Sequence, residues 1–186
     1  MSSTSTQSIP PGKIVLTYDD YCELPNDRNR YEILDGELAV TPAPRTNHQS
    51  LYRILANHIV TNQLGDIYAA PTDVILAPTT VVQPDLIFVS NDRRGIITER
   101  AIEGAPALAV EILSPSTQLT DRQTKAQLYA KYAVPHYWLI DPDQQTLEAY
   151  ELAGDQYQLV VKAQNAEMVT PSLFPGPSLS LADLWA

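Results

Sequence analysis

Two acidic residues, Asp85 and Glu111, lie inside segments that otherwise have the composition of buried strands. The first segment spans 81–89 and the second spans 107–113, and both are largely apolar. A charge buried without a partner costs several kcal/mol, so each carboxylate needs a partner. A divalent cation with a lysine nearby would supply that partner, and such a group can cut a phosphodiester bond.

The two carboxylates fall on defined faces of their predicted strands. Alternate residues of a strand point to the same side, which places Asp85 with Ile87 and Glu111 with Ala109. If the two strands are neighbours, the carboxylates stand close together, and two like charges there cannot both stay ionised without a cation. Mg²⁺ or Mn²⁺ is suited to carboxylate oxygens and to water ligands, one of which can become the attacking nucleophile.

Lys125 completes this predicted site. Glu111 lies three residues before Ser114, about 10 Å back along its strand at ~3.3 Å per residue. Lys125 lies about eight residues into the helix that follows, about 12 Å along it at ~1.5 Å per residue. A helix folded back over the sheet would return Lys125 to the level of Glu111, where its ammonium can orient the attacking water or stabilise developing negative charge.

These residues also have structural alternatives. Asp85 could be a turn residue or the residue that begins a strand. Glu111 could form a structural salt bridge with an arginine of 93–100. Asp121 and Lys125 have the four-residue spacing of a solvated pair on a helix surface. The spacing of the residues leaves both sets of interpretations open.

Glu32 and His48 are candidates for an auxiliary role. Glu32 lies in a predicted hairpin strand and His48 lies near the start of a predicted helix, and each could instead serve capping or packing. The sequence contains no glycine-rich phosphate loop, no zinc-ligand spacing and no Gly-x-Ser-x-Gly turn. These absences argue against a kinase, a zinc hydrolase and a serine hydrolase.

The composition predicts a single globular domain at 13–186, since the chain has 186 residues and is 44% hydrophobic. Residues 1–12 lack the basic and apolar blocks of a signal peptide, and we expect a disordered tail there. No apolar run approaches the ~20 residues of a membrane span, so we expect no membrane partner. A single cysteine, Cys22, excludes an internal disulfide and fits a reducing, cytoplasmic location.

The net charge of −10 argues against tight nonspecific binding to DNA, because contacts to phosphates dominate that affinity. The charge is unevenly distributed along the chain. Residues 42–131 hold eight acidic and eight basic side chains, whereas residues 132–186 hold seven acidic side chains and one lysine. The neutral middle of the chain therefore leaves a metal-assisted cut of a nucleic acid open.

The order of predicted elements indicates an α/β or α+β domain with a mixed sheet flanked by helices. The Asp-Gly pair at 35–36 predicts a hairpin between strands 31–34 and 37–40. Apolar residues recur at helical spacing between 46 and 64, which predicts a helix over about these residues. We further expect helices at 18–24, after 117 to about 132, and at 181–185, and strands at 67–70, 73–77, 81–89, 107–113, 136–140, 147–152 and 157–162.

Several strings of residues carry a family resemblance when they are taken in order along the chain. They are YEILDGEL at 31–38, Asn47-His48, PDLIFV at 84–89, VEILSPST at 110–117, Asp121, Lys125, Tyr129, and VPHYWLIDP at 134–142. Together they resemble the Uma family of restriction-endonuclease-like proteins, within the PD-(D/E)XK superfamily of nucleases. The resemblance runs from about residue 17 to 185.

The resemblance implies a four-stranded core sheet with helices on both sides and a divalent-metal site on two central strands. It implies that Asp85 is the aspartate of the Pro-Asp element and that Glu111 is the second acidic ligand. The superfamily's usual lysine, two residues after that glutamate, is replaced here by Leu113. The chain resembles branches in which this lysine has moved to the next helix, where Lys125 stands. Glu32 matches a further motif position near the expected site, as does His48.

These observations predict a Mg²⁺- or Mn²⁺-dependent endonuclease that hydrolyses phosphodiester bonds in a nucleic acid, with DNA favoured. Asp85 and Glu111 hold the metal, Lys125 orients water or stabilises charge, and Glu32 or His48 assists. The alternative is a catalytically silent module of the same fold that binds DNA or protein, which the acidic charge supports. Hydrolysis of another phosphoester and a homodimeric state also stay open.

Overall fold

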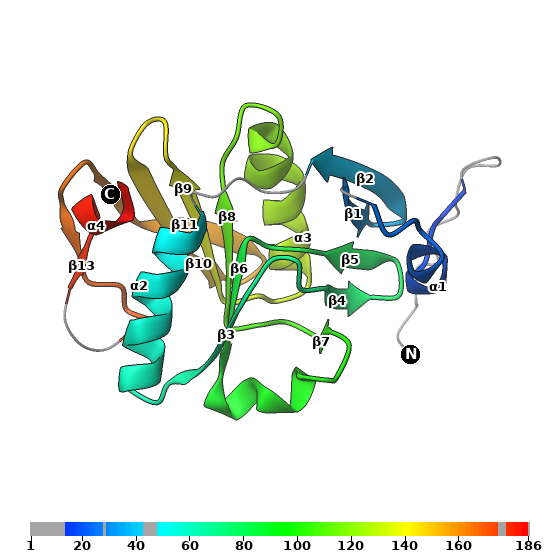
Figure 1. Cartoon of the computed structure of the whole chain (residues 1–186), viewed down its shortest axis with the longest axis horizontal. Helices are drawn as coiled ribbons and strands as arrows, with labels where there is room; N and C mark the ends of the chain where they lie inside the picture. Colours follow the sequence, from blue (N-terminus) through cyan, green and yellow to red (C-terminus); the bar gives the residue numbers. More distant parts are fainter. Residues whose placement is uncertain (1–13, 28, 43–47, 175–177, 186) are drawn as a thin grey trace.

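The computed structural model of the chain describes residues 14–27, 29–42, 48–174 and 178–185 (Figure 1). The disordered tail predicted at 1–12 lies outside the described residues. No helix within the described ranges is long and apolar enough to cross a membrane.

The larger of the two main sheets has six strands in the order β11-β10-β9-β8-β6-β3. β8 and β9 run parallel, whereas the other neighbouring pairs are antiparallel. This arrangement is the mixed sheet expected from the sequence. The strands are β3 (Gly65–Ala69), β6 (Leu86–Ser90), β8 (Leu108–Ile112), β9 (His136–Asp141), β10 (Thr146–Ala153) and β11 (Gln156–Gln164).

A second sheet of five strands, in the order β2-β1-β5-β4-β7, contains the predicted hairpin. Asp35 and Gly36 form the turn with φ of 53° and 88°, the positive values that a two-residue turn of this kind requires. Only β4 and β7 run parallel among the described pairs of this sheet. The strands are β1 (Asn29–Leu34), β2 (Glu37–Pro42), β4 (Val74–Ala77), β5 (Thr80–Val82) and β7 (Ile102–Glu103).

The single strand predicted at 81–89 is wrong, because the chain leaves one sheet and enters the other within it. β5 and β6 flank a gap that belongs to neither strand. Pro84 in this gap has no N–H to donate to a strand and restricts the residue before it. The N–H of Gln83 donates instead to Glu32 Oε1 over 2.8 Å. The break places Asp85 at the junction of the two sheets.

Helices cover both faces of the six-stranded sheet (Figure 1). α2 (His48–Thr61) packs on one face and α3 (Ala126–Lys131) on the other. The helix predicted after 117 to about 132 is confirmed, but its segment Thr120–Lys125 before α3 is a π-helix, η2. The spacing of residues along the chain does not predict the buried ion pairs that this segment forms through Lys125. The remaining elements are α1 (Tyr18–Cys22), the 3-10 helix η1 (Asn91–Ile96), α4 (Ala182–Trp185), β12 (Met168–Val169) and β13 (Leu179–Ser180).

Two hydrophobic cores lie on the two faces of this sheet, and alternate residues of β9 divide between them. Trp138 and Ile140 belong to the core beneath α2 and are 1% and 3% exposed. Tyr137 and Leu139 belong to the core beneath α3, together with Tyr129 of that helix. The strand predicted at 136–140 is confirmed as β9, and its pairing with β8 places it beside the strand of Glu111.

Replacing Gly65 with alanine is expected to destabilise the six-stranded sheet. A Cβ added there would lie 2.2 Å from the backbone oxygen of Val89 in the neighbouring strand, which is far inside contact distance. Overpacking of this kind costs about 1–3 kcal/mol. We expect thermal denaturation to show a fall in melting temperature of roughly 2–12 °C for a domain of this size.

Gly95→Ala in η1 is the matched control, because its added Cβ would have nothing within 4 Å. This variant should melt within about 2 °C of the wild type. Equal melting temperatures for Gly65→Ala and Gly95→Ala would contradict the close approach of β3 to β6.

Candidate active site

Asp85 and Glu111 face each other across neighbouring strands. In the antiparallel pair of β6 and β8, Leu86 lies opposite Val110. Asp85, one residue before β6, therefore comes opposite Glu111, one residue further along β8. The Oδ2 atom of Asp85 accepts a hydrogen bond from the backbone N–H of Ile112 over 2.7 Å. This bond holds the Asp85 carboxylate against β8, although Asp85 itself precedes the strand.

Lys125 projects from the end of the π-helix into a cluster of three carboxylates. Its Nζ atom lies 3.0 Å from Glu32 Oε1 and 3.1 Å from Glu111 Oε1. The same atom lies 3.5 Å from Asp121 Oδ1. The four side chains are between 2% and 4% exposed. The structure thus brings Glu111, Lys125 and Glu32 together, and the pair of Asp121 with Lys125 is buried rather than solvated.

Arg30 is a site residue that the sequence analysis missed. Its Nη2 atom donates to Asp85 Oδ1 over 2.8 Å, and its side chain is 9% exposed. Residues two apart in a strand share a face, so Arg30 and Glu32 of β1 reach the site together. That spacing was the available signal. The arginines of 93–100 contact neither carboxylate of the predicted metal pair in any described bond: their partners are Ala105, Asp66 and Glu103.

Two tyrosine hydroxyls, which the sequence analysis did not assign to the site, donate to acidic residues of the cluster, one to a side chain and one to a backbone oxygen. Tyr129 donates to Glu111 Oε1 over 2.7 Å, and Tyr137 donates to the backbone oxygen of Asp121 over 2.9 Å. Burial raises the pKa of each hydroxyl well above its ordinary value, so both remain protonated donors. Tyr129 lies four residues after Lys125, and this spacing on one helix face was the available signal.

Negative charge is in surplus around Lys125, where three carboxylates surround one ammonium. Burial raises the pKa of Glu111 to about 8; Lys125 opposes this shift, whereas repulsion from Asp121 and Asp85 adds to it. Burial also raises the pKa of Asp121. Burial alone would lower the pKa of Lys125, but the carboxylates, Glu111 foremost, raise it above its ordinary value. Lys125 therefore stays cationic, and Glu111 can hold a proton near neutral pH.

The oxygens of Asp85 and Glu111 fit a hard divalent cation. Mg²⁺ is usually held through one or two carboxylates and keeps several waters. The surplus negative charge and the raised pKa of Glu111 both favour an additional positive charge here. Within the described part of the chain, no three His, Cys, Asp or Glu side chains already surround one ion position, so water would complete the donor set. Binding would require these carboxylates to exchange contacts with Arg30 and Lys125.

His48 is the first residue of α2, and its side chain lies outside what the structure describes. Its auxiliary role stays a prediction. The metal-binding role of Asp85 and Glu111 likewise stays a prediction.

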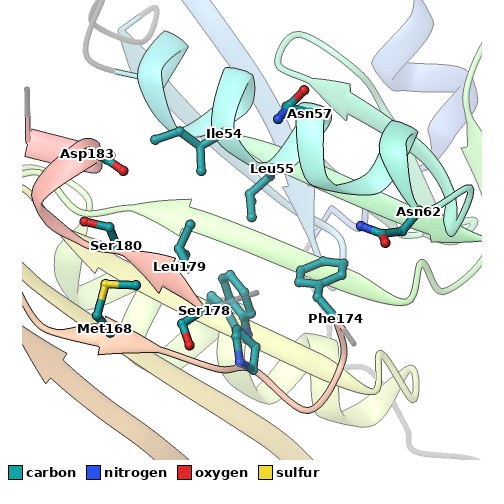
Figure 2. Close-up of a pocket in the computed structure, with 12 residues that line it drawn as sticks. Ile54, Leu55, Asn57, Asn62, Met168, Phe174, Ser178, Leu179, Ser180 and Asp183 are labelled. Atoms are coloured by element: carbon teal, nitrogen blue, oxygen red, sulfur yellow. The ribbon is translucent and has the colours of Figure 1, made fainter. Parts of the chain in front are cut away.

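A separate pocket of about 440 Å³ lies between α2 and the β12–β13 pair (Figure 2). Leu55 and Phe174 line it, and both belong to the core beneath α2. Glu111 shares its strand face with Ala109, which belongs to the core beneath α3. The pocket is therefore on the opposite face of the six-stranded sheet and is not part of the candidate active site.

Glu111→Gln is expected to change the pH dependence of stability. The folded protein holds a proton on Glu111 up to about pH 8, whereas the unfolded chain releases it near its ordinary pKa of 4.5. This group therefore stabilises the wild type fully below pH 4.5 and loses that contribution as pH rises through 8. Glutamine cannot ionise, so the variant does not lose this contribution. The free energy of unfolding of the variant, relative to that of the wild type, should therefore be higher at pH 8 than at pH 5, by an amount on the order of a few kcal/mol.

Thermal denaturation at both pH values in EDTA would check this expectation. Glu99→Gln makes the same chemical change at an exposed position and serves as the control. A difference between variant and wild type that does not change with pH would contradict the raised pKa. A large loss of melting temperature at both pH values would mark Glu111 as half of a structural ion pair.

The sequence matches a family model, and the fold is similar to that of a solved structure. A family model named Uma2 and described as "Putative restriction endonuclease" matches residues 18–182. A solved structure from Anabaena variabilis ATCC 29413, described as "a putative nuclease belonging to DUF820", is similar with a TM-score of 0.73 and 22% identity. The similarity covers 91% of this chain and 97% of that one, and it confirms the predicted fold class. A search of curated proteins finds no match.

Proposed function

The chain belongs to the Uma2 family, and from this premise we propose that it is a divalent-metal-dependent endonuclease that hydrolyses phosphodiester bonds in DNA. Membership in this family supports a nuclease function in general. The observation that carries the proposal is the meeting of Asp85, Glu111 and Lys125 at the junction of two sheets. Two carboxylates on neighbouring strands with a lysine beside them are suited to a metal-assisted cut.

In the proposed mechanism, Asp85 and Glu111 would hold Mg²⁺ or Mn²⁺ through their oxygens, and the bound cation would supply an attacking water of lowered pKa. Lys125 would donate hydrogen bonds to the attacking water or to the phosphoryl oxygens, where negative charge develops. Glu32 and Asp121 keep the ammonium of Lys125 protonated and in place. Glu32 would therefore act as a positioning residue, which is the form its predicted auxiliary role takes here.

The test is cleavage of nucleic acids by the purified protein with and without Mg²⁺ or Mn²⁺. We expect cleavage of DNA only with the metal. Asp85→Asn and Glu111→Gln keep the side-chain size and remove a ligand charge, so calorimetry should show Mn²⁺ binding weakened by about 10–100-fold or more. Cleavage should fall at least as far. Lys125→Met should lower cleavage strongly while changing Mn²⁺ affinity less, because its role is toward water and phosphate.

Controls separate the metal role from general damage. Glu99→Gln changes the same chemical group at an exposed position and should cleave like the wild type. Single- and double-stranded DNA and RNA should be tested side by side, since DNA is the proposed substrate. Equal Mn²⁺ affinity in the wild type and Glu111→Gln, or undiminished cleavage in EDTA, would contradict the proposal.

The second candidate function is a catalytically silent module that binds DNA or protein. The observation that favours it is the closure of the site: Arg30 pairs with Asp85 and Lys125 pairs with Glu111, and all four side chains are at most 9% exposed. Such a cluster can serve as a buried structural ion-pair network. Binding of DNA without metal-dependent cleavage, and with equal strength in Glu111→Gln, would favour this function over the nuclease.

A further inference from the structure

Two buried polar atoms near the candidate site have no hydrogen-bond partner. Among the described residues, these are Nε of Arg30 and the hydroxyl oxygen Oγ1 of Thr41. Leaving a buried donor unsatisfied destabilises the folded protein, and more so when the group is charged. Native structures keep few such atoms, so each one requires an explanation.

The two atoms belong to side chains that lie directly opposite each other. Arg30 of β1 is the register partner of Thr41 of β2. Opposed side chains of an antiparallel pair stand on one face, with Cβ atoms about 4.5–5.5 Å apart. Glu32 is two residues from Arg30 and shares this face, on which it contacts Lys125. The unsatisfied pair therefore faces the same region as the candidate metal site.

Arg30 connects this pair to the candidate metal ligands. Its Nη2 atom bonds Asp85 Oδ1 at 2.8 Å, while Nε of the same guanidinium stays unsatisfied. The side chain is about nine-tenths buried, with 9% exposed. A guanidinium presents its N–H donors in a rigid planar fork that matches the oxygens of a phosphate. A hydroxyl beside such a fork supplies one more donor to the same anion.

We propose that Arg30 and Thr41 form a phosphate-binding subsite that holds the phosphodiester of the substrate beside Asp85. This inference rests on the proposed nuclease function and names two residues that bind its substrate. Nε of Arg30 and Oγ1 of Thr41 donate to phosphate oxygens, and in the metal-free protein Nη2 of the same guanidinium holds Asp85. Binding of the phosphate satisfies both unpaired atoms and places the anion next to a carboxylate assigned to the metal.

The test measures phosphate binding without any metal. Inorganic phosphate would be titrated by ³¹P NMR, and a fluorescent DNA duplex by anisotropy, both in EDTA. Arg30→Lys keeps the charge and removes Nε and the fork, so we expect both probes to bind about tenfold more weakly or worse. Thr41→Val keeps the shape and removes the hydroxyl, and should weaken binding by roughly threefold to tenfold. Thr41→Ser keeps the hydroxyl and should bind within about twofold of the wild type.

The outcomes separate this inference from the nuclease proposal. Because the titrations contain no metal, they test the subsite even if the wild type cleaves nothing. Mn²⁺ affinity should be unchanged in Thr41→Val, and any cleavage by this variant should show a raised KM with a smaller change in kcat. If Arg30→Lys fails to fold, Thr41→Val and Thr41→Ser decide alone. Equal phosphate and DNA affinity in the wild type and Thr41→Val, or no phosphate binding by the wild type, would overturn the subsite.

Discussion

A buried ammonium surrounded by carboxylates holds the centre of this protein together. Lys125 joins side chains from three parts of the chain: Glu32 from β1, Glu111 from β8 and Asp121 from the π-helix. Since β1 and β8 belong to different sheets, these ion pairs tie both sheets to one helix. Removing the ammonium of Lys125 would leave Glu32 and Asp121 buried without compensation, and breaking a buried ion pair in this way costs about 3–5 kcal/mol. The placement of the two sheets therefore depends on the charges of this cluster.

The break between β5 and β6 places two residues of the connection at this cluster. The polar groups of the break form hydrogen bonds with residues of both sheets and with neighbouring side chains. The N–H of Gln83 donates to Glu32, and its side-chain amide donates to Asp73 Oδ1 at 2.7 Å and to the Tyr21 hydroxyl at 2.9 Å. Asp85, at the other end of the break, accepts the N–H of a β8 residue. A buried backbone group outside a ladder needs such partners. One short connection thus links the two sheets and presents a carboxylate of the candidate site.

Sequence reasoning identified those candidate site residues that carry a local signal. Asp85 and Glu111 stand out as charges in apolar runs, and the position of Lys125 follows from the lengths of a strand and a helix. Arg30 has only a weak local signal, its two-residue spacing from Glu32, and its contact with Asp85 depends on the pairing of β1 with β5. The π-helix and the division of 81–89 between two sheets were missed for the same reason. Each depends on contacts between distant parts of the chain, which local periodicity does not register.

The closed ion pairs and the proposed metal site are compatible because of the charges involved. The carboxylates around Lys125 outnumber it, so a divalent cation at Asp85 and Glu111 would reduce the surplus of negative charge instead of creating a positive one. That cation would compete with Lys125 for Glu111 and with Arg30 for Asp85. Both basic side chains would then be available to a phosphodiester, whose negative charge they can pair with. The same two cations can therefore stabilise the folded protein before metal and substrate bind and stabilise the substrate afterwards, so the closure that favours the silent module is also compatible with the proposed nuclease.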